Sequence, residues 1–236
     1  MKINAEFDQR VVVHSENIPW VDSPMAGVSR RPLDRVGDEV ARASTIVRYA
    51  PNSHFSPHVH TGGEEFIVLS GVFQDEHGDF PTGSYIRNPP LSKHQPGSAD
   101  GCVIFVKLWQ FEPDDRTHVR LNTQFMQAVP HRDLAGISVT PLYHDDAEQV
   151  TLIDWEPNAK LTIDAVRGAE LLVIEGELTE GDDTLVKHSW LRAPIGSSIQ
   201  LCAGAKGAKA WVKQGHLNRV EQEIKRVADT GKKSAT

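Results

Sequence analysis

The sequence contains very little cysteine. Only Cys102 and Cys202 occur among 236 residues, and neither belongs to a C-x-x-C pair. Small domains held together by disulfides, and zinc sites built from cysteines, need more cysteines at closer spacing. The sequence therefore excludes both classes.

Long apolar runs and an excess of positive charge are also lacking. The apolar run near the N-terminus, residues 11–13, is too short for a signal peptide, and no stretch approaches the roughly 20 apolar residues of a membrane span. Lys and Arg number 25 against 32 Asp and Glu, so the net charge of −7 creates no positive field for nucleic acid or anionic lipid. We therefore expect a cytoplasmic protein that binds neither nucleic acid nor membranes, and whose partners are small molecules or other proteins.

An internal repeat spans most of the chain. The segment STIVRYAPN at 44–52 aligns with VTLIDWEPN at 150–158, an offset of 106 (158 minus 52). The match continues from EFIVLSG to ELLVIEG, from SYIRNP to SWLRAP, and from Pro32-Leu33 to Pro141-Leu142. We interpret the chain as two copies of one domain, residues 1–124 and residues 125–236.

Each copy consists of short β-rich runs separated by turn residues, in a chain with 18 Gly and 14 Pro. In the first copy these runs are 45–49, 65–69, 85–87 and 103–108. Such spacing is typical of antiparallel sandwich or barrel modules and predicts an all-β fold of two tandem barrels. Apolar residues recur at helical spacing only near the end, at Val220, Ile224 and Val227, which predicts a short amphipathic helix followed by a loose tail.

The densest polar cluster of the first copy surrounds a Gly-Gly turn. His58 and His60 are two apart, so on a strand they face the same side, and the turn brings Glu64 or Glu65 back beside them. His94 follows about thirty residues later, where a neighbouring strand could place it on the same interior. Three imidazoles and a carboxylate suit a transition metal such as Zn, Fe(II), Mn, Ni or Cu. Without a cation, burying them together would be costly.

The arrangement resembles the cupin superfamily. The first cupin motif, G-x5-H-x-H-x3/4-E-x6-G, is matched from Asn52 to Gly71, with Asn in place of the leading Gly. The second, G-x5-P-x-G-x2-H-x3-N, is matched from Gly83 to Ser98, with Leu91 and Ser98 in place of Gly and Asn. The resemblance implies jelly-roll barrels and one divalent metal, Zn or Fe, with a ligand set at the retained motif positions. That set is His58, His60, Glu64 and His94.

Glu64 is preferred over Glu65 as the carboxylate ligand. Alternation along the strand does not decide between them, because both faces of residues 66–69 are apolar. The spacing to Gly71 and the short turn favour Glu64. Glu65 also has a counterpart, Glu170, in the second copy, where no site is expected.

In the second copy, apolar residues replace all four candidate ligands. Ile163, Ala165, Ala169 and Ile199 align with His58, His60, Glu64 and His94, respectively. Incidental surface histidines would have mixed polar counterparts. The uniform replacement predicts that the four positions lie inside the barrel, and that the second copy is a degenerate cupin domain with a dry core.

A narrower resemblance covers nearly all of the first copy, through GGEE at 62–65, GVF at 71–73, RNPP at 87–90, Gly101-Cys102 and VKLWQ at 106–110. These segments are similar to the C-terminal cupin domain of ChrR-type anti-sigma factors and to related stand-alone metal-dependent dioxygenases. In the anti-sigma factors, a helical N-terminal domain with an H-x3-C-x2-C zinc motif binds the sigma factor. This sequence shows no such motif, so we expect the sigma-binding half to be missing.

Two functions follow from these resemblances. One is a metal-binding bicupin that acts as a sensor, like the cupin domain of the anti-sigma factors, with a small-molecule ligand and a regulatory protein as partners. The alternative is a non-haem metal-dependent dioxygenase acting on a small diketone-like or hydroxyketone-like substrate. A metal that only stabilises the fold is a third interpretation. Exposed strand edges lead us to expect a homodimer.

Overall fold

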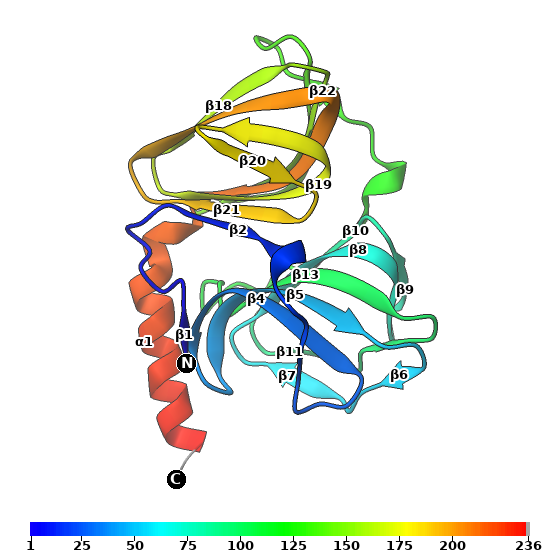
Figure 1. The fold of residues 1–236 in the computed structure, drawn as a ribbon. Coiled ribbons are helices and arrows are strands. Elements are labelled where there is room, and N and C mark those ends of the chain that lie inside the picture. Colours follow the sequence, from blue (N-terminus) through cyan, green and yellow to red (C-terminus); the bar gives the residue numbers. More distant parts are fainter. Residues whose placement is uncertain (235–236) are drawn as a thin grey trace. The chain divides into compact units, whose positions relative to one another are not determined.

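The computed structural model describes residues 1–234 and divides the chain into two compact units. The first unit comprises Met1–Ala5, Pro19–Phe125 and the described residues from Glu221 onward. The second comprises Glu6–Ile18 and Met126–Val220. Each unit contains one antiparallel β-barrel, here called the first and the second barrel (Figure 1). The predicted all-β fold of two tandem barrels with a C-terminal helix is confirmed.

The first barrel is built around a sheet in the order β1-β4-β5-β13-β8-β10-β14, with β3, β6, β9 and β12 paired to its members. A separate two-stranded sheet joins β11 to β7. The elements are β1 (Lys2–Ile3), β3 (Val21–Asp22), β4 (Val28–Gly37), β5 (Ala41–Tyr49), β6 (Ser53–His54), β7 (His58–His60), β8 (Glu64–Asp75), β9 (Gly78–Pro81), β10 (Ser84–Asn88), β11 (Ser92–His94), β12 (Gly97–Ser98), β13 (Cys102–Leu108), β14 (Val119–Asn122) and η2 (Thr123–Phe125).

The second barrel has the sheet order β15-β16-β17-β22-β19-β21-β2, with β18 paired to β22 and β20 to β19. Its elements are β2 (Val11–His14), η1 (Ser15–Asn17), β15 (Val129–Pro130), β16 (Ile137–His144), β17 (Gln149–Trp155), β18 (Lys160–Ala165), β19 (Ala169–Glu180), β20 (Asp183–Val186), β21 (Ser189–Ala193), β22 (Ser197–Gln214) and η3 (His216–Arg219).

The two units differ from the ranges expected from the repeat, 1–124 and 125–236, because terminal segments are exchanged. Strand β2 pairs with β21 of the second barrel, with Val11 opposite Arg192 and His14 opposite Ser189 (Figure 1). In the first barrel, β14 occupies the corresponding place beside β10. The outer strand of the second barrel therefore comes from the N-terminus of the chain, which a tandem alignment cannot reveal.

The C-terminal helix α1 (Val220–Ser234) is longer than expected, because it continues through Gly231 into the segment predicted as a loose tail. Residues 235–236 of that tail lie outside the described residues. From Glu221 on, α1 belongs to the first unit. There the buried Glu223 carboxylate accepts a hydrogen bond of 2.7 Å from Arg42 Nε, and Arg226 donates to the Phe111 carbonyl. These contacts dock the helix on the first unit although it follows the second barrel in sequence.

The repeat is visible in the backbone as well as in the sequence. Asn52 and Asn158 both adopt left-handed conformations, with φ of 57° and 61°. Gly71 and Gly176 have φ of 73° and 71°, and a Cβ on either would lie 2.1 Å from the carbonyl oxygen of Gly101 or Gly207. Only glycine tolerates such a close approach. The two barrels therefore share the same bulged frame.

The two barrel cores are filled differently. The core of the first barrel includes Phe66, Phe73 and Cys102, and burial raises the pKa of the Cys102 thiol to about 11, which fits the predicted small core residue. The core of the second barrel is an aliphatic cluster to which β17, β18, β19, β21 and β22 all contribute. The first barrel therefore combines an aromatic-rich core with polar residues such as His94, which contacts Phe73, whereas the core cluster of the second barrel is apolar.

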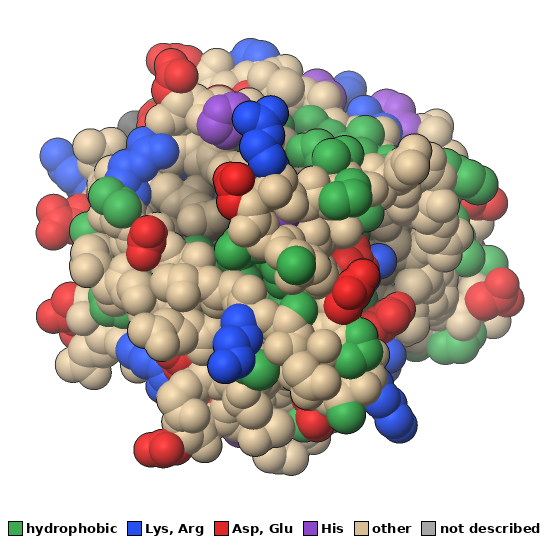
Figure 2. Space-filling view, turned by 90° about the horizontal axis from the view of Figure 1, so that it is seen from above, with side chains coloured by type: hydrophobic (Ala, Val, Ile, Leu, Met, Phe, Trp, Pro, Cys, Tyr) green, Lys and Arg blue, Asp and Glu red, His purple; other side chains and the backbone are tan. Residues whose placement is uncertain are grey.

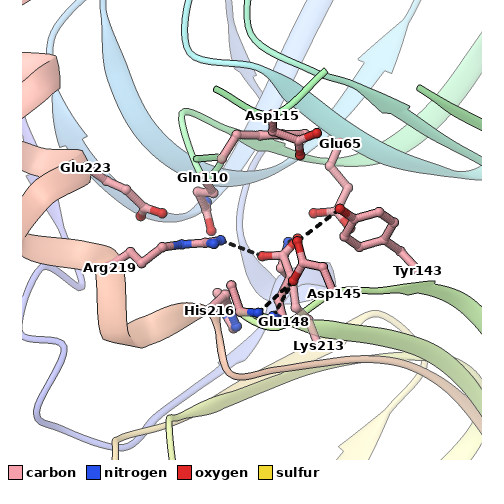
Figure 3. A network of polar contacts seen from close by, with 12 residues as sticks. Glu65, Gln110, Asp115, Tyr143, Asp145, Glu148, Lys213, His216, Arg219 and Glu223 are labelled. Atoms are coloured by element: carbon pink, nitrogen blue, oxygen red, sulfur yellow. Dashed lines mark hydrogen bonds and ion pairs between the residues drawn. The ribbon is translucent and has the colours of Figure 1, made fainter. Parts of the chain in front are cut away.

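Buried charged groups of the second barrel are paired (Figure 3). The Glu148 carboxylate accepts hydrogen bonds from Lys213 Nζ at 3.0 Å and from Arg219 at 2.7 Å, and all three side chains are buried. His216 Nε2 lies 2.9 Å from Glu170 Oε1. Because buried charges are tolerated when they are paired, we assign these groups a structural role in the second barrel.

The surface shows mixed charge. On the face drawn in Figure 2, Lys and Arg side chains are interspersed with Asp and Glu. Among the described residues, no helix is long and apolar enough to cross a membrane.

Candidate metal centre

The pairing of β7 with β11 brings three histidines together. In this two-stranded sheet His94 lies directly opposite His58, and Ser92 lies opposite His60. Side chains directly opposite one another, or two apart on one strand, project from the same face. The sequence spacing of His58, His60 and His94 therefore becomes a single cluster.

The three imidazoles are in mutual contact. Their ring centroids are 4.7 Å apart for His58 and His60, 5.1 Å for His58 and His94, and 4.6 Å for His60 and His94. One nitrogen of each ring lies within 4.8 Å of the others. His60 and His94 are buried, while His58 is partly exposed. The cluster can thus hold a metal ion on three nitrogens.

Glu64 is the carboxylate that reaches this cluster. Its Oε2 lies 3.4 Å from His60 Nε2 and 3.5 Å from His94 Nε2. Glu65 points elsewhere and accepts a hydrogen bond of 2.6 Å from the Tyr85 hydroxyl. The carboxylate preferred from spacing, from the short turn and from the repeat is thus the one that lies beside His60 and His94.

The Gly62-Gly63 turn positions Glu64. A Cβ on Gly62 would lie 2.1 Å from the Trp109 ring, and a Cβ on Gly63 would lie 2.5 Å from the Phe111 ring. Gly63 also has a φ of +80°, which side chains disfavour. Two aromatic rings therefore pack directly on the turn backbone, and they fix the start of β8 beside β7.

Further polar groups contact three of the four side chains. Asp75 Oδ2 lies 3.2 Å from His94 Nδ1, and the Ser56 carbonyl oxygen lies 3.2 Å from His58 Nδ1. Asn88 Nδ2 donates to Glu64 Oε2 at 3.5 Å. Contacts to the outer nitrogen of a histidine direct its other nitrogen toward a metal and raise its basicity. The support around the cluster is the kind that metal-binding histidines have.

The electrostatics of the cluster also suit a cation. Burial lowers the pKa of His60, which favours the neutral imidazole that a metal requires. Burial opposes protonation of His94 as well, but its hydrogen bond to Asp75 and the charge of Glu64 raise its pKa above the ordinary value. The carboxylates Glu64 and Asp75 thus stabilise positive charge at this point.

The donor set passes a direct test of fit. His60 Nε2 is buried and makes no hydrogen bond to any described residue, although Glu64 is 3.4 Å away. A buried polar atom without a hydrogen bond costs about 1 to 3 kcal/mol. A divalent ion among these donors would satisfy it, and three imidazoles with one carboxylate are typical transition-metal ligands.

The second barrel holds apolar side chains at the equivalent positions. Ile163 pairs with Ile199 between β18 and β22, just as His58 pairs with His94. All four counterparts, Ile163, Ala165, Ala169 and Ile199, are buried in the aliphatic core cluster. Their interior location supports the interior location inferred for the polar set of the first barrel.

A cavity of about 330 Å³ adjoins the cluster in the first barrel. Its walls include His58, His60 and Glu64 together with apolar and hydroxyl side chains from β4, β5 and β13. Val59, which is 53% exposed, is among its lining residues, so the cavity reaches the surface. Its volume is at the small end of the range for ligand sites.

The other polar candidates near the motif mostly lie elsewhere. Arg48, on β5, stacks on the Trp20 ring at 4.5 Å. Arg87 and Lys107 are buried, with Arg87 stacked on the Phe111 ring at 4.2 Å and Lys107 donating to Ser44 Oγ. Arg192, the counterpart of Arg87 in the repeat, is also buried and stacks on Phe7 at 4.2 Å, so both arginines have a structural role.

Two supporting residues were missed by the sequence reasoning. Asn88 aligns with Ala193, which lies in the aliphatic core of the second barrel, so the same comparison that singled out the histidines could have found it. Asp75 aligns with Glu180, another carboxylate, and no sequence signal distinguishes it.

The family comparison concerns the part of the chain that holds this cluster. The family model of the ChrR cupin-like domain matches residues 8–112. This range includes His58, His60, Glu64 and His94. A comparison with curated protein sequences finds no match.

Solved structures place the chain in the cupin fold. The putative dioxygenase of Nostoc punctiforme PCC 73102 has a TM-score of 0.75 at 15% identity, over 89% of this chain and 84% of that one. The putative glyoxylate-induced protein of Pseudomonas aeruginosa has a TM-score of 0.68 at 16% identity, over 87% of both chains. The pirin YhhW of Escherichia coli, in complex with nickel(II), has a TM-score of 0.64 at 12% identity, over 88% of this chain and 99% of that one. Such low identities establish the fold alone.

Two of the three departures from the cupin motif, Asn52 and Leu91, replace glycines, and the backbone at both positions keeps the left-handed conformation that glycine would adopt. Asn52 has a φ of 57° and Leu91 a φ of 70°. Asn tolerates the left-handed region, whereas Leu is strained there. The Leu91 amide also donates to the His60 carbonyl at 2.9 Å, so this turn holds β11 against β7. The turn at Leu91 is therefore retained although its left-handed conformation is strained for leucine.

Leu91→Gly should therefore stabilise the protein. Leu91 is 63% exposed, so little packing is lost, while relief of the left-handed strain outweighs the entropy that glycine adds. We expect the free energy of unfolding of the metal-free protein to rise by about 0.5 to 1 kcal/mol, measured by urea denaturation. Leu91→Ala keeps the strain and should give no gain. Equal effects from the two variants would contradict the explanation.

Proposed function

We propose that the first barrel binds one divalent transition metal through His58, His60, Glu64 and His94, and that this centre acts on a small oxygen-containing molecule held in the adjoining cavity. The observation that carries the proposal is a cluster of three imidazoles and one carboxylate, of which His58, His60 and Glu64 line a cavity that reaches the surface. A metal that only stabilised the fold would need no such cavity.

A divalent ion bound here would supply Lewis acidity toward substrate oxygens, and iron would add O2 chemistry at the positions that the protein leaves open. The protein's own contribution lies in holding the substrate. Val47, Ile104 and Val106 form apolar walls of the cavity. Oxygens of the substrate would face the cluster, and its carbon frame would pack on these walls.

Tyr49 supplies a hydrogen-bond donor to the same cavity. Burial and the charge of Glu64 raise the pKa of its phenol well above the usual value, so the hydroxyl stays protonated. Edge contacts with Phe55 and Phe73, at centroid distances of 5.3 and 5.8 Å, fix its ring. We assign Tyr49 the role of orienting a substrate oxygen by hydrogen bonding.

A metal-responsive sensor is the second candidate. It is favoured by the match of residues 8–112 to the ChrR cupin-like domain. In that function the cavity would bind a signal molecule and the output would be a change at a protein surface. The two functions share the metal centre and differ in whether the bound molecule is converted.

Substitution of one ligand should abolish metal binding. We expect about one metal ion per chain in protein purified without chelators, and loss of most of it in His60→Ala, as measured by elemental analysis. Ile199→Val in the second barrel is the matched control, because Ile199 takes the place of a ligand in the repeat. It should keep the metal while lowering the free energy of unfolding by about 0.5 to 1.5 kcal/mol. A metal content near two ions per chain, or full retention in His60→Ala, would refute the ligand assignment.

Oxygen uptake distinguishes the enzyme from the sensor. The protein is loaded anaerobically with Fe(II), then mixed with O2 and a panel of β-diketones and hydroxyketones while oxygen and products are followed. The enzyme should consume oxygen only with substrate present, and Glu64→Ala should abolish the consumption. Asp79→Asn, which removes an exposed carboxylate that contacts Gln74, should leave it unchanged.

Absence of turnover with any metal would contradict the enzyme. Ligand-dependent binding to a regulatory protein, observed together with that absence, would support the sensor. In both outcomes the metal content of the wild-type protein still tests the centre itself.

A further inference from the structure

One wall of the cavity carries two arginines, Arg30 and Arg35, both on β4. Simple alternation would put residues 30 and 35 on opposite faces of a strand. The pairing of β4 with β5 shifts register between Pro32 and Asp34, which leaves Leu33 as an extra residue. Because the bulge resets the alternation, Arg35 returns to the face that Arg30 occupies.

Arg30 and Arg35 are not equivalent in their partners. Arg35 Nε donates to the Gly37 carbonyl at 3.3 Å, and its Nη2 donates to the Asp38 carbonyl. Arg30 makes no hydrogen bond or ion pair with any residue among the described 1–234. It is partly buried beside Val47, its register partner, which also lines the cavity. An arginine that lines a cavity and makes no such contact points to a ligand that supplies one.

The charges along this wall favour an anion. Burial and the nearby charge of Arg30 lower the pKa of Arg35, which shows that the two cations repel each other. Glu39, exposed at the hairpin after β4, is the negative side chain that lines the cavity besides Glu64. In the proposed centre, Glu64 is committed to the metal. A negative group placed beside Arg30 would offset the repulsion.

The equivalent position of the second barrel shows that Arg30 is not needed to build the barrel. The same bulge occurs in the second barrel, between Pro141 and Tyr143, so it belongs to both copies. There the position of Arg30 is occupied by Val139, which pairs with Ile153 and packs on the aliphatic core. Arg30 has therefore been replaced by an apolar residue in the copy that lacks the four ligands, as would be expected if it serves the same site.

We propose that Arg30 binds the carboxylate of the molecule that occupies this cavity, so that the ligand is a small oxo- or hydroxy-carboxylate whose other oxygens face the histidine cluster. This inference rests on the proposed metal centre and specifies the class of its substrate or signal. Arg and carboxylate groups pair through two parallel hydrogen bonds, which orients the ligand as well as binding it. A volume of about 330 Å³ limits the ligand to a small molecule.

A matched pair of probes isolates the carboxylate. In 2,4-dioxopentanoate a β-diketone carries a carboxylate, and in its methyl ester the same diketone carries none. Binding of each to the Zn(II)-loaded protein, in which no redox turnover occurs, is measured by titration calorimetry. We expect the acid to bind at least tenfold more tightly than the ester, a preference that falls as NaCl is raised from 0.05 to 0.5 M.

Variants of Arg30 test whether this residue causes the preference for the acid over the ester. Arg30→Gln should remove the preference for the acid while leaving ester binding and zinc content unchanged, and Arg30→Lys should retain part of it. Arg48→Gln is the matched control, because Arg48 is exposed on β5 and stacks on Trp20 outside the cavity. It should behave as the wild type. The wild-type ratio of acid to ester and its salt dependence need no variant, so they test the proposal even if Arg30→Gln does not fold.

Three results would overturn the inference. Equal binding of acid and ester to the wild-type protein would exclude carboxylate recognition while leaving the metal centre intact. A preference that survives in Arg30→Gln would show that the carboxylate binds elsewhere, for example on the metal. Failure of the wild-type protein to retain zinc would remove the metal centre, and with it this inference, and elemental analysis identifies that case.

Discussion

The cost of burying polar donors inside a β-barrel is the constraint on which the first barrel depends. His60, His94 and Glu64 are buried, and Glu64 Oε2 lies 3.4 Å from His60 Nε2 and 3.5 Å from His94 Nε2, yet His60 Nε2 makes no hydrogen bond to a described residue. A cation among these donors would offset that cost. The surrounding structure serves the same end, since Asp75 and Asn88 hold the donors and the rings of Trp109 and Phe111 fix the turn that delivers Glu64.

The second barrel shows what the same frame does without that constraint. It keeps the bulges, the left-handed Asn158 and the close approach at Gly176. Its interior is closed by aliphatic side chains at every ligand position, and also at the positions of Asn88 and Arg30. The comparison within one chain thus separates residues that build a cupin barrel from residues that give it chemistry. Arg87 and Arg192 fall in the first group, and Arg30 falls in the second.

Much of this could be predicted from the sequence. The strands and the tandem barrels follow from short apolar runs and the repeat, and the polar cluster follows from the spacing of its histidines. The exchange of β2 could not be predicted, because a four-residue strand carries no signal for its partner. The inward turn of Arg35 depends on a bulge at Leu33, and the support of His94 by Asp75 depends on tertiary contact. These features depend on strand register and on contacts between distant residues, and the periodicity of apolar residues in the sequence does not predict either.

The location of the bound metal tests the account most directly. Anomalous diffraction at the metal absorption edge, from crystals of protein purified without chelators, would show each ion and its ligands. The account predicts one peak in the first barrel, at roughly 2.0 to 2.3 Å from donor atoms of His58, His60, Glu64 and His94. A peak in the second barrel, or one in the first barrel that these side chains do not surround, would contradict it.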